Sequence, residues 1–262
     1  MVILRHMSPR TKPAPDSAHG RSGFALPFMV AGREAMAFAR QAWLLRHDLL
    51  EPVVPANVGE DDDVVVFLHG LFASAGVLRP MRAQIMRHQG MHAAALSYGP
   101  GPGVDKIAGR LTGLLRDLPS TASIHLVGHS LGGIVARYYA QEIVDPRVVQ
   151  TISLSSPFAG VPRAAWLGFE GARDLDPDSP LLRRLRLRSS AHAIPHLSII
   201  AGADRIVKSP IAHALPGGDV TVMKDRGHNT LLFDEEVARV VEQRILDLRR
   251  ARRRDSGVVA AE

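Results

Sequence analysis

A serine flanked by glycines in the segment GHSLG, residues 128–132, is the first candidate for chemistry in this chain. The apolar residues IHLV before the segment predict a strand, and IVARYYAQ after it predicts a helix. A sharp strand-to-helix turn exposes the serine Oγ, and Gly128, Gly132 and Gly133 leave room for the crowded backbone. This context favours Ser130 as a nucleophile over a residue of an ordinary glycine-rich turn.

A serine hydroxyl needs a base that takes its proton near neutral pH, and the base needs a carboxylate that fixes its tautomer. After a nucleophile turn of this type the chain order is serine, acid, histidine. Of the 12 histidines, His213 and His228 follow an acid that fits this order. His228 stands between the last predicted strand and the last predicted helix, whereas His213 lies in an irregular stretch. We therefore favour His228 as the base.

Asp204 is the favoured acid because it follows the apolar run HLSIIAGA at the carboxyl end of a predicted strand. The carboxyl ends of parallel strands form one rim, so this position brings Asp204 to the same rim as Ser130. Asp219 and Asp225 flank the last predicted strand and stay open as weaker alternatives. The sequence thus predicts a triad of Ser130, Asp204 and His228.

Attack of a serine on an ester carbonyl creates an oxyanion, which needs hydrogen-bond donors already in place. The backbone N–H of Leu131, directly after the nucleophile, is one expected donor. The second is expected from Leu71, in the loop after the first main strand, where His69 and Gly70 shape the backbone.

The elements around these residues alternate between short apolar runs and helical patterns. This alternation predicts an α/β protein with a mostly parallel central sheet, helices on both faces and a small helical cap. The predicted strands are residues 64–70, 91–97, 123–129, 148–156, 196–202 and 219–224. The predicted helices among them are residues 76–89, 104–118, 131–144 and 234–249.

The chain is long enough for one large domain, which we expect over residues 24–250. An amphipathic helix at about 33–50 is expected to pack against that domain. Residues 1–23 are expected to form a disordered tail, and residues 251–262 a basic tail. No recognisable signal peptide begins the sequence, which favours a cytoplasmic or peripheral membrane protein.

Residues 158–195 break the alternation and are rich in apolar side chains. A structureless loop of this length is uncommon in a compact domain, so we expect a helical cap over the sheet edge. The hypothesis is that the cap lines an acyl pocket, against the simpler interpretation that its side chains only pack on the sheet. The candidate pocket residues are His69, Phe72, Phe158, Trp166 and Phe169.

Composition excludes several other functions. The chain has no cysteine, so disulfides and cysteine zinc sites are ruled out. The histidine pairs have no metal-binding spacing and no glycine-rich nucleotide loop appears, so we expect neither a metal nor another cofactor. Much of the net charge of +6 comes from the arginine run at 249–254, which is more typical of a solvated tail than of a nucleic-acid site.

Five segments carry a family resemblance: HGLFAS, IHLVGHSLGGIVARYY, ISLSSPFAG, GADRIV and GHNTLLF, in this order. Over roughly residues 30–245 the chain resembles bacterial lipases and esterases of the α/β-hydrolase superfamily. The resemblance implies the same triad and oxyanion donors, and hydrolysis of a small-molecule or lipid carboxylic ester through an acyl-enzyme, with contact to a lipid surface as a further option. Acyltransferases and perhydrolases share these motifs, and a non-catalytic binding protein with the same fold is the alternative from another class.

Overall fold

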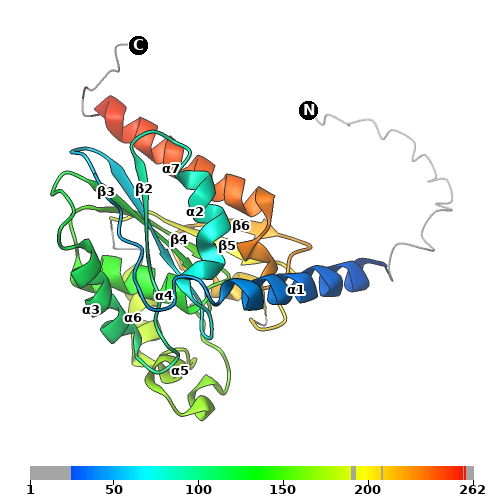
Figure 1. Ribbon diagram of the computed structural model, residues 1–262. Coiled ribbons are helices and arrows are strands. Elements are labelled where there is room, and N and C mark those ends of the chain that lie inside the picture. The colour runs from blue at the N-terminus through cyan, green and yellow to red at the C-terminus, as the bar shows by residue number, and fades with distance from the viewer. Residues whose placement is uncertain (1–24, 190–192, 208, 256, 258–262) are drawn as a thin grey trace, which may run out of the picture.

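Six strands form one central sheet in the computed structural model, which describes residues 25–189, 193–207, 209–255 and 257 (Figure 1). The strand order is β2-β1-β3-β4-β5-β6, and every neighbouring pair is parallel. The strands are β1 (Asp63–Leu68), β2 (Met91–Leu96), β3 (Ser123–His129), β4 (Val148–Leu154), β5 (His196–Ala201) and β6 (Asp219–Met223). The predicted parallel α/β architecture is confirmed.

The order of the strands reverses beside β1, because β2 lies on one side of it and β3 on the other. In open parallel sheets such a reversal leaves a crevice at the carboxyl ends of the two central strands, where ligands bind. The loops that follow β1 and β3 therefore lie next to each other at the carboxyl ends of these strands.

Helices cover both faces of the sheet. The α-helices are α1 (Ala25–Leu44), α2 (Arg79–Ile85), α3 (Val104–Leu115), α4 (Leu131–Tyr138), α5 (Glu170–Asp174), α6 (Pro180–Ser189) and α7 (Glu235–Asp255). Short helical turns are η1 (Ala75–Leu78), η2 (Tyr139–Ile143), η3 (Ala164–Leu167), η4 (Pro210–His213) and η5 (Thr230–Leu232).

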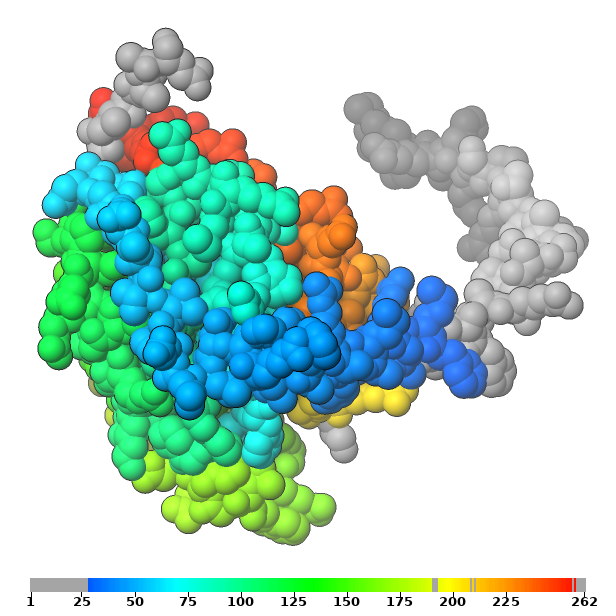
Figure 2. All heavy atoms as spheres, in the orientation of Figure 1, coloured from blue at the N-terminus to red at the C-terminus, as the bar shows by residue number. Residues whose placement is uncertain are grey.

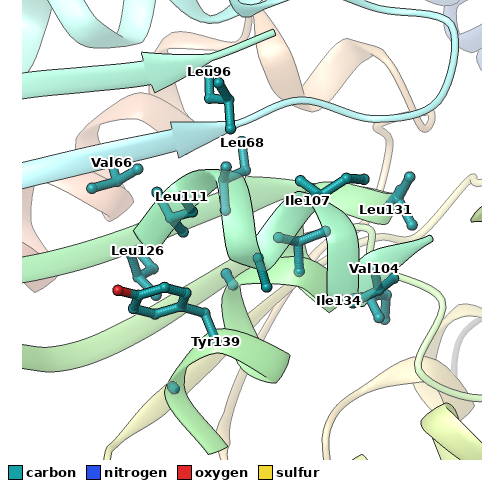
Figure 3. Packing of buried hydrophobic residues seen from close by; sticks show 14 of the residues in the cluster. Val66, Leu68, Leu96, Val104, Ile107, Leu111, Leu126, Leu131, Ile134 and Tyr139 are labelled. Atoms are coloured by element: carbon teal, nitrogen blue, oxygen red, sulfur yellow. The ribbon is translucent and has the colours of Figure 1, made fainter. Parts of the chain in front are cut away.

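Alternate residues of the strands face opposite cores. On β1, Val64 and Val66 pack with α3 and α4, whereas Val65 and Phe67 pack with α2 and α7. Figure 3 shows the first of these cores, with side chains of the two helices against the strands. Because all six residues of β1 are buried, the strand reads as a continuous apolar run rather than an alternating one.

The N-terminal helix differs from its predicted bounds of 33–50. α1 begins at Ala25, because the apolar stretch before Arg33 continues the helix, and it ends at Leu44. The chain then turns at Asp48, which has φ 54°. The Ser74 hydroxyl donates a hydrogen bond to the backbone O of His47. These tertiary contacts end the helix earlier than the sequence pattern indicates.

The arginine run near the C-terminus is helical rather than a tail, so the predicted boundary at residue 251 is wrong. α7 continues to Asp255 because Arg249 is anchored to the domain, through an ion pair of 2.8 Å with Asp63 and a hydrogen bond of 2.8 Å to the backbone O of Gln89. The predicted N-terminal tail and most residues after Asp255 lie outside the described residues. No helix in the described ranges has the length and apolar character needed to cross a membrane.

The segment 158–195 folds into η3, α5 and α6, so the predicted helical cap is present. It is joined to the first turn of α3, because Asp174 accepts a hydrogen bond from the backbone N–H of Val104 at 2.7 Å. A second hydrogen bond, from the Gly103 N–H to Glu170, measures 3.2 Å. In Figure 1 α5 lies at one end of the molecule, below α3 and α4.

Candidate active site

Ser130 lies on a strained turn between β3 and α4, with φ 52° and ψ −120°. A non-glycine residue rarely adopts positive φ, and such strain persists only where the surrounding structure holds it. Here the Ser130 N–H donates a 2.9 Å hydrogen bond to the backbone O of Leu154, at the end of β4. The side chain is partly exposed, as a nucleophile at the crevice must be.

The turn is tight enough to exclude side chains on its flanking glycines. A Cβ on Gly128 would lie 2.2 Å from the backbone O of Gly132. A Cβ on Gly132 would lie 2.1 Å from the backbone O of Leu68, so α4 starts in contact with the end of β1. The glycine spacing in the sequence thus reflects close backbone approach on both sides of Ser130.

Asp204 and His228 come together at the same rim, with His228 Nδ1 2.7 Å from Asp204 Oδ2. Both side chains are almost completely buried. Asp204 Oδ1 accepts hydrogen bonds from the backbone N–H groups of Ile206 and Val207, each at 2.8 Å. Burial raises the pKa of Asp204, but the hydrogen bond from His228 and the backbone donors outweigh it and leave the pKa below its ordinary value. An ionised Asp204 holds the proton on Nδ1 and leaves Nε2 of His228 free to act as a base.

Asp204 and His228 are joined by a hydrogen bond, whereas the described residues show none between Ser130 Oγ and His228. His129, the neighbour of Ser130 in the chain, contacts His228. Their ring centroids lie 4.8 Å apart. His129 Nε2 donates to the backbone O of His228 at 3.1 Å. Burial lowers the pKa of His129 to about 3, so this ring stays neutral and braces the His228 loop. Sequence reasoning missed this role.

The loop after β1 lies directly against Ser130. A Cβ on Gly70 would be 3.0 Å from the Ser130 Cβ and 3.1 Å from His129 Nδ1, so a larger residue would press against both. Leu71 follows at once, and Leu131 is the first residue of α4, where a backbone N–H has no partner within the helix. Both predicted donors thus belong to segments that adjoin the nucleophile.

His69 supports this loop and does not line a pocket, which corrects its assignment as a pocket residue. Its ring is fully buried and stacked on Tyr98, with ring centroids 3.9 Å apart. Nε2 accepts a hydrogen bond from the Tyr98 N–H at 3.1 Å, so Nδ1 carries the proton and donates to the backbone O of Gly70 at 2.7 Å. Burial lowers the pKa of His69 to about 4.

Two other candidate pocket residues differ sharply in exposure. Phe158 is completely buried, with its ring edge-to-face on His196 at 5.4 Å, so it belongs to the core. Trp166 is 79% exposed, with the Arg163 guanidinium 5.0 Å from its ring centroid. Phe72 and Phe169 contact each other edge-to-face at 6.2 Å and join the cap to the loop after β1.

The alternative acids and base are placed differently. Asp219 is the first residue of the edge strand β6, at the amino end of the parallel strands, whereas Ser130 follows the carboxyl end of β3. Asp219 forms an ion pair with Arg244 at 2.7 Å. Asp225 lies in the turn after β6. The histidine that is hydrogen-bonded to Asp204 is His228, whereas His213 is the last residue of η4.

Glu34 on α1 is a further residue at this site that sequence reasoning missed. Its carboxylate accepts four hydrogen bonds from the two residues after His228: from the N–H and side-chain amide of Asn229 at 2.8 and 3.0 Å, and from the N–H and hydroxyl of Thr230 at 3.0 and 2.7 Å. A Cβ on Gly227 would lie 2.3 Å from Glu34 Oε2. The N-terminal helix therefore clamps both sides of His228. No local signal marks this contact in the sequence.

Within the described ranges, no group of three or more histidine, aspartate or glutamate side chains is arranged to hold a metal ion.

Known proteins share parts of this sequence pattern and this fold. Residues 64–179 match the family model described as palmitoyl protein thioesterase. The mature form of the lipase BlEst2 from Bacillus licheniformis superposes with a TM-score of 0.58 at 15% identity, over 75% of this chain and 97% of that one. The chain has the α/β-hydrolase fold. No curated protein sequence matches it.

Two further structures share this α/β-hydrolase fold. One comes from the metagenome-derived lipolytic enzymes LipS and LipT, with a TM-score of 0.59 at 15% identity, over 78% of this chain and 99% of that one. The other is Est1E from Butyrivibrio proteoclasticus, with a TM-score of 0.55 at 16% identity, over 75% of this chain and 92% of that one. The likeness to lipases and esterases thus spans nearly the whole of each relative.

Proposed function

We propose that this α/β-hydrolase-fold protein cleaves carboxylic esters through an acyl-enzyme, with Ser130 as nucleophile, His228 as base and Asp204 as acid. The observation that carries the proposal is the buried hydrogen bond of 2.7 Å between His228 and Asp204 on the rim where Ser130 is held in a strained turn. The substrate is a small-molecule or lipid ester, in keeping with the lipases and esterases that share the fold.

In this mechanism Ser130 Oγ attacks the ester carbonyl while His228 Nε2 takes the hydroxyl proton. Asp204 stabilises the imidazolium that forms, and the backbone N–H groups of Leu71 and Leu131 donate to the oxyanion. The bond between the acyl carbon and the leaving oxygen then breaks, and His228 gives its proton to that oxygen. Water, activated by the same histidine, releases the acid and restores Ser130.

A thioester is the second candidate substrate, and the family match favours it specifically, because the matching model describes a palmitoyl protein thioesterase. The same triad would serve, with a thiol as leaving group. Paired substrates with one acyl group, an octanoyl oxygen ester and an octanoyl thioester, distinguish the two. A kcat/KM that is about tenfold higher for the thioester would assign the thioester class.

The deciding experiment is labelling of the folded protein with a fluorophosphonate probe. We expect labelling of wild type and none of Ser130→Ala, together with ester hydrolysis that Ser130→Ala and His228→Ala each remove almost entirely. The double variant should be little worse than either single one, because the two residues act as a unit. Absence of Ser130-dependent labelling would instead favour a non-catalytic binding protein, and additive losses would contradict the triad.

A further inference from the structure

A cavity of about 300 Å³ lies between α1 and the two loops that carry Asp204 and His228. Its walls are Val30, Ala31 and Phe38 from α1, Ala203 and Ile206 from the loop after β5, and His228 itself. In Figure 2, α1 (blue) lies along the surface beside the segment that follows β5 (yellow). The cavity opens outward, since Phe38 is 50% and Ile206 48% exposed.

Specific contacts hold the walls of this cavity in place. Glu34 also lines it, and the four hydrogen bonds to Asn229 and Thr230 hold α1 against the His228 loop. Gly227 adds a close contact, because a Cβ there would meet the Glu34 carboxylate at 2.3 Å. The spacing between the helix and the loop is therefore set by polar contacts, and the apolar side chains beside them remain available to a ligand.

The position of the cavity relative to the reacting groups decides which part of an ester it would hold. An ester carbonyl at the reacting position has its oxygen toward the N–H groups of Leu71 and Leu131. The leaving oxygen has to lie within reach of His228, because that residue returns the proton to it. The cavity is lined by His228 and includes none of Ser130, Leu71 and Leu131. Of the groups expected to contact the ester, the cavity thus adjoins the one nearest the leaving oxygen.

The lining is mostly apolar, and sites for small molecules are generally apolar with a few polar groups that orient the ligand. Burial of an alkyl chain favours binding in proportion to the area removed from water. Among the described residues that line the cavity, Arg205 carries a positive charge, and it is exposed. The chemistry fits an alkyl or aryl group rather than a sugar or a charged headgroup.

We propose that this cavity, named here the α1 cavity, binds the apolar alcohol of the ester substrate and sets the preference for leaving group. The inference rests on the proposed ester hydrolysis and assigns the two sides of the ester to different parts of the fold. The acyl side faces the Phe72 and Phe169 contact, and the alcohol side faces α1.

The experiment fills the α1 cavity by Ala35→Trp, since Ala35 lines it. Ala42→Trp, at an exposed position on the same helix outside the cavity, is the matched control. Hydrolysis of ethyl acetate is compared with that of octyl acetate, so that the acyl group stays constant. We expect Ala35→Trp to lower kcat/KM for octyl acetate by about tenfold relative to ethyl acetate, and Ala42→Trp to leave the ratio unchanged.

Measuring deacylation separately from acylation tests whether the substitution affects only the alcohol side of the ester. The alcohol leaves before deacylation and both acetates give the same acetyl-enzyme, so a change at the alcohol site should leave the deacylation rate of Ala35→Trp equal to that of wild type. A series of p-nitrophenyl esters of increasing acyl length should also keep its profile. An unchanged ratio of the two acetates, or a shifted acyl profile, overturns the assignment of the α1 cavity. If wild type hydrolyses no ester and fails to label with the fluorophosphonate, the proposed function itself fails, which is a different result.

Discussion

Glu34 and Thr230 are joined by two hydrogen bonds to one carboxylate oxygen, although they are 196 positions apart in the chain. One comes from the Thr230 N–H at 3.0 Å and the other from its hydroxyl at 2.7 Å. Thr230 begins η5, two residues after His228. The N-terminal helix thus determines where the loop of the proposed base lies.

Replacement of Glu34 should therefore disturb catalysis as well as stability. In Glu34→Gln the side-chain NH₂ faces the backbone N–H of Asn229 or Thr230, so at least one hydrogen bond is lost and the His228 loop is held less firmly. We expect kcat for ethyl acetate to fall by about tenfold with little change in KM. The free energy of unfolding should fall by about 2 kcal/mol, because these hydrogen bonds go to a charged group.

Arg33→Gln, a change of charge at the neighbouring exposed position of α1, is the control for Glu34→Gln and should match wild type. A Glu34→Gln variant that unfolds more easily but keeps the wild-type kcat would show that Glu34 only braces the fold.

The acid of the triad can be tested by three asparagine substitutions. Asp204→Asn should lower kcat by about 10⁴-fold, because an amide no longer stabilises the Nδ1-protonated tautomer of His228 or the imidazolium. Asp219→Asn and Asp225→Asn should stay near wild type, since Asp219 lies at the amino end of β6 and Asp225 has no hydrogen bond to His228 among the described residues. An inactive Asp225→Asn beside an active Asp204→Asn would reverse the assignment.

Two glycines in helices offer opposite stability changes. Gly132→Ala, at the start of α4, should prevent correct folding or remove activity, because its Cβ would lie 2.1 Å from the backbone O of Leu68. Gly113→Ala, in α3, has no atom within 4 Å of its added Cβ and should raise the free energy of unfolding by about 0.5–1 kcal/mol. Urea unfolding of both variants measures the difference. Equal behaviour of the two would contradict the close approach at the nucleophile turn.

The contact between Phe72 and Phe169 predicts how the cap affects acyl preference. Phe169→Ala should shift the optimum of a p-nitrophenyl ester series toward a different acyl length while acetate hydrolysis changes little. Trp166→Ala should leave the profile unchanged, because that ring is 79% exposed and contacts Arg163. A shift caused by Trp166→Ala and absent from Phe169→Ala would place the acyl group elsewhere on the cap.

Three buried histidines make stability depend on pH. Burial lowers the pKa of His69 to about 4, that of His129 to about 3 and that of His196 well below its ordinary value of 6.5. Below about pH 6.5 the unfolded chain binds protons that the folded chain does not, so the free energy of unfolding falls as pH drops from 6.5 toward 4. Each histidine contributes up to about 1.4 kcal/mol per pH unit in this window.

Urea unfolding at pH 7.5, 6.5 and 5.5 measures this slope. His196→Gln should show a shallower fall than wild type, by one histidine's share, because glutamine does not take up a proton in the unfolded chain. A free energy of unfolding that is constant from pH 6.5 to 5.5 would disprove the expectation.

Local patterns in the sequence determined most of the elements. β3 occupies the predicted residues 123–129, because a continuous apolar run that ends in glycine and serine suits a strand buried on both faces. The nucleophile turn could be read in the same way, since the glycines around Ser130 are required by backbone crowding within a few residues. Chain order along a parallel sheet was enough to predict that Asp204 and His228 would reach one rim.

Tertiary structure alone decided the contacts that join distant segments. The hydrogen bonds of Glu34 to Asn229 and Thr230, the brace from His129 to the His228 backbone and the α1 cavity depend on where α1 packs, and periodicity does not encode that position. The burial of His69 and Phe158 and the exposure of Trp166 likewise follow from which side of each loop faces the core. Short-range sequence fixes backbone conformation and apolar faces, whereas side-chain partners more than a hundred positions apart emerge only once those faces have packed.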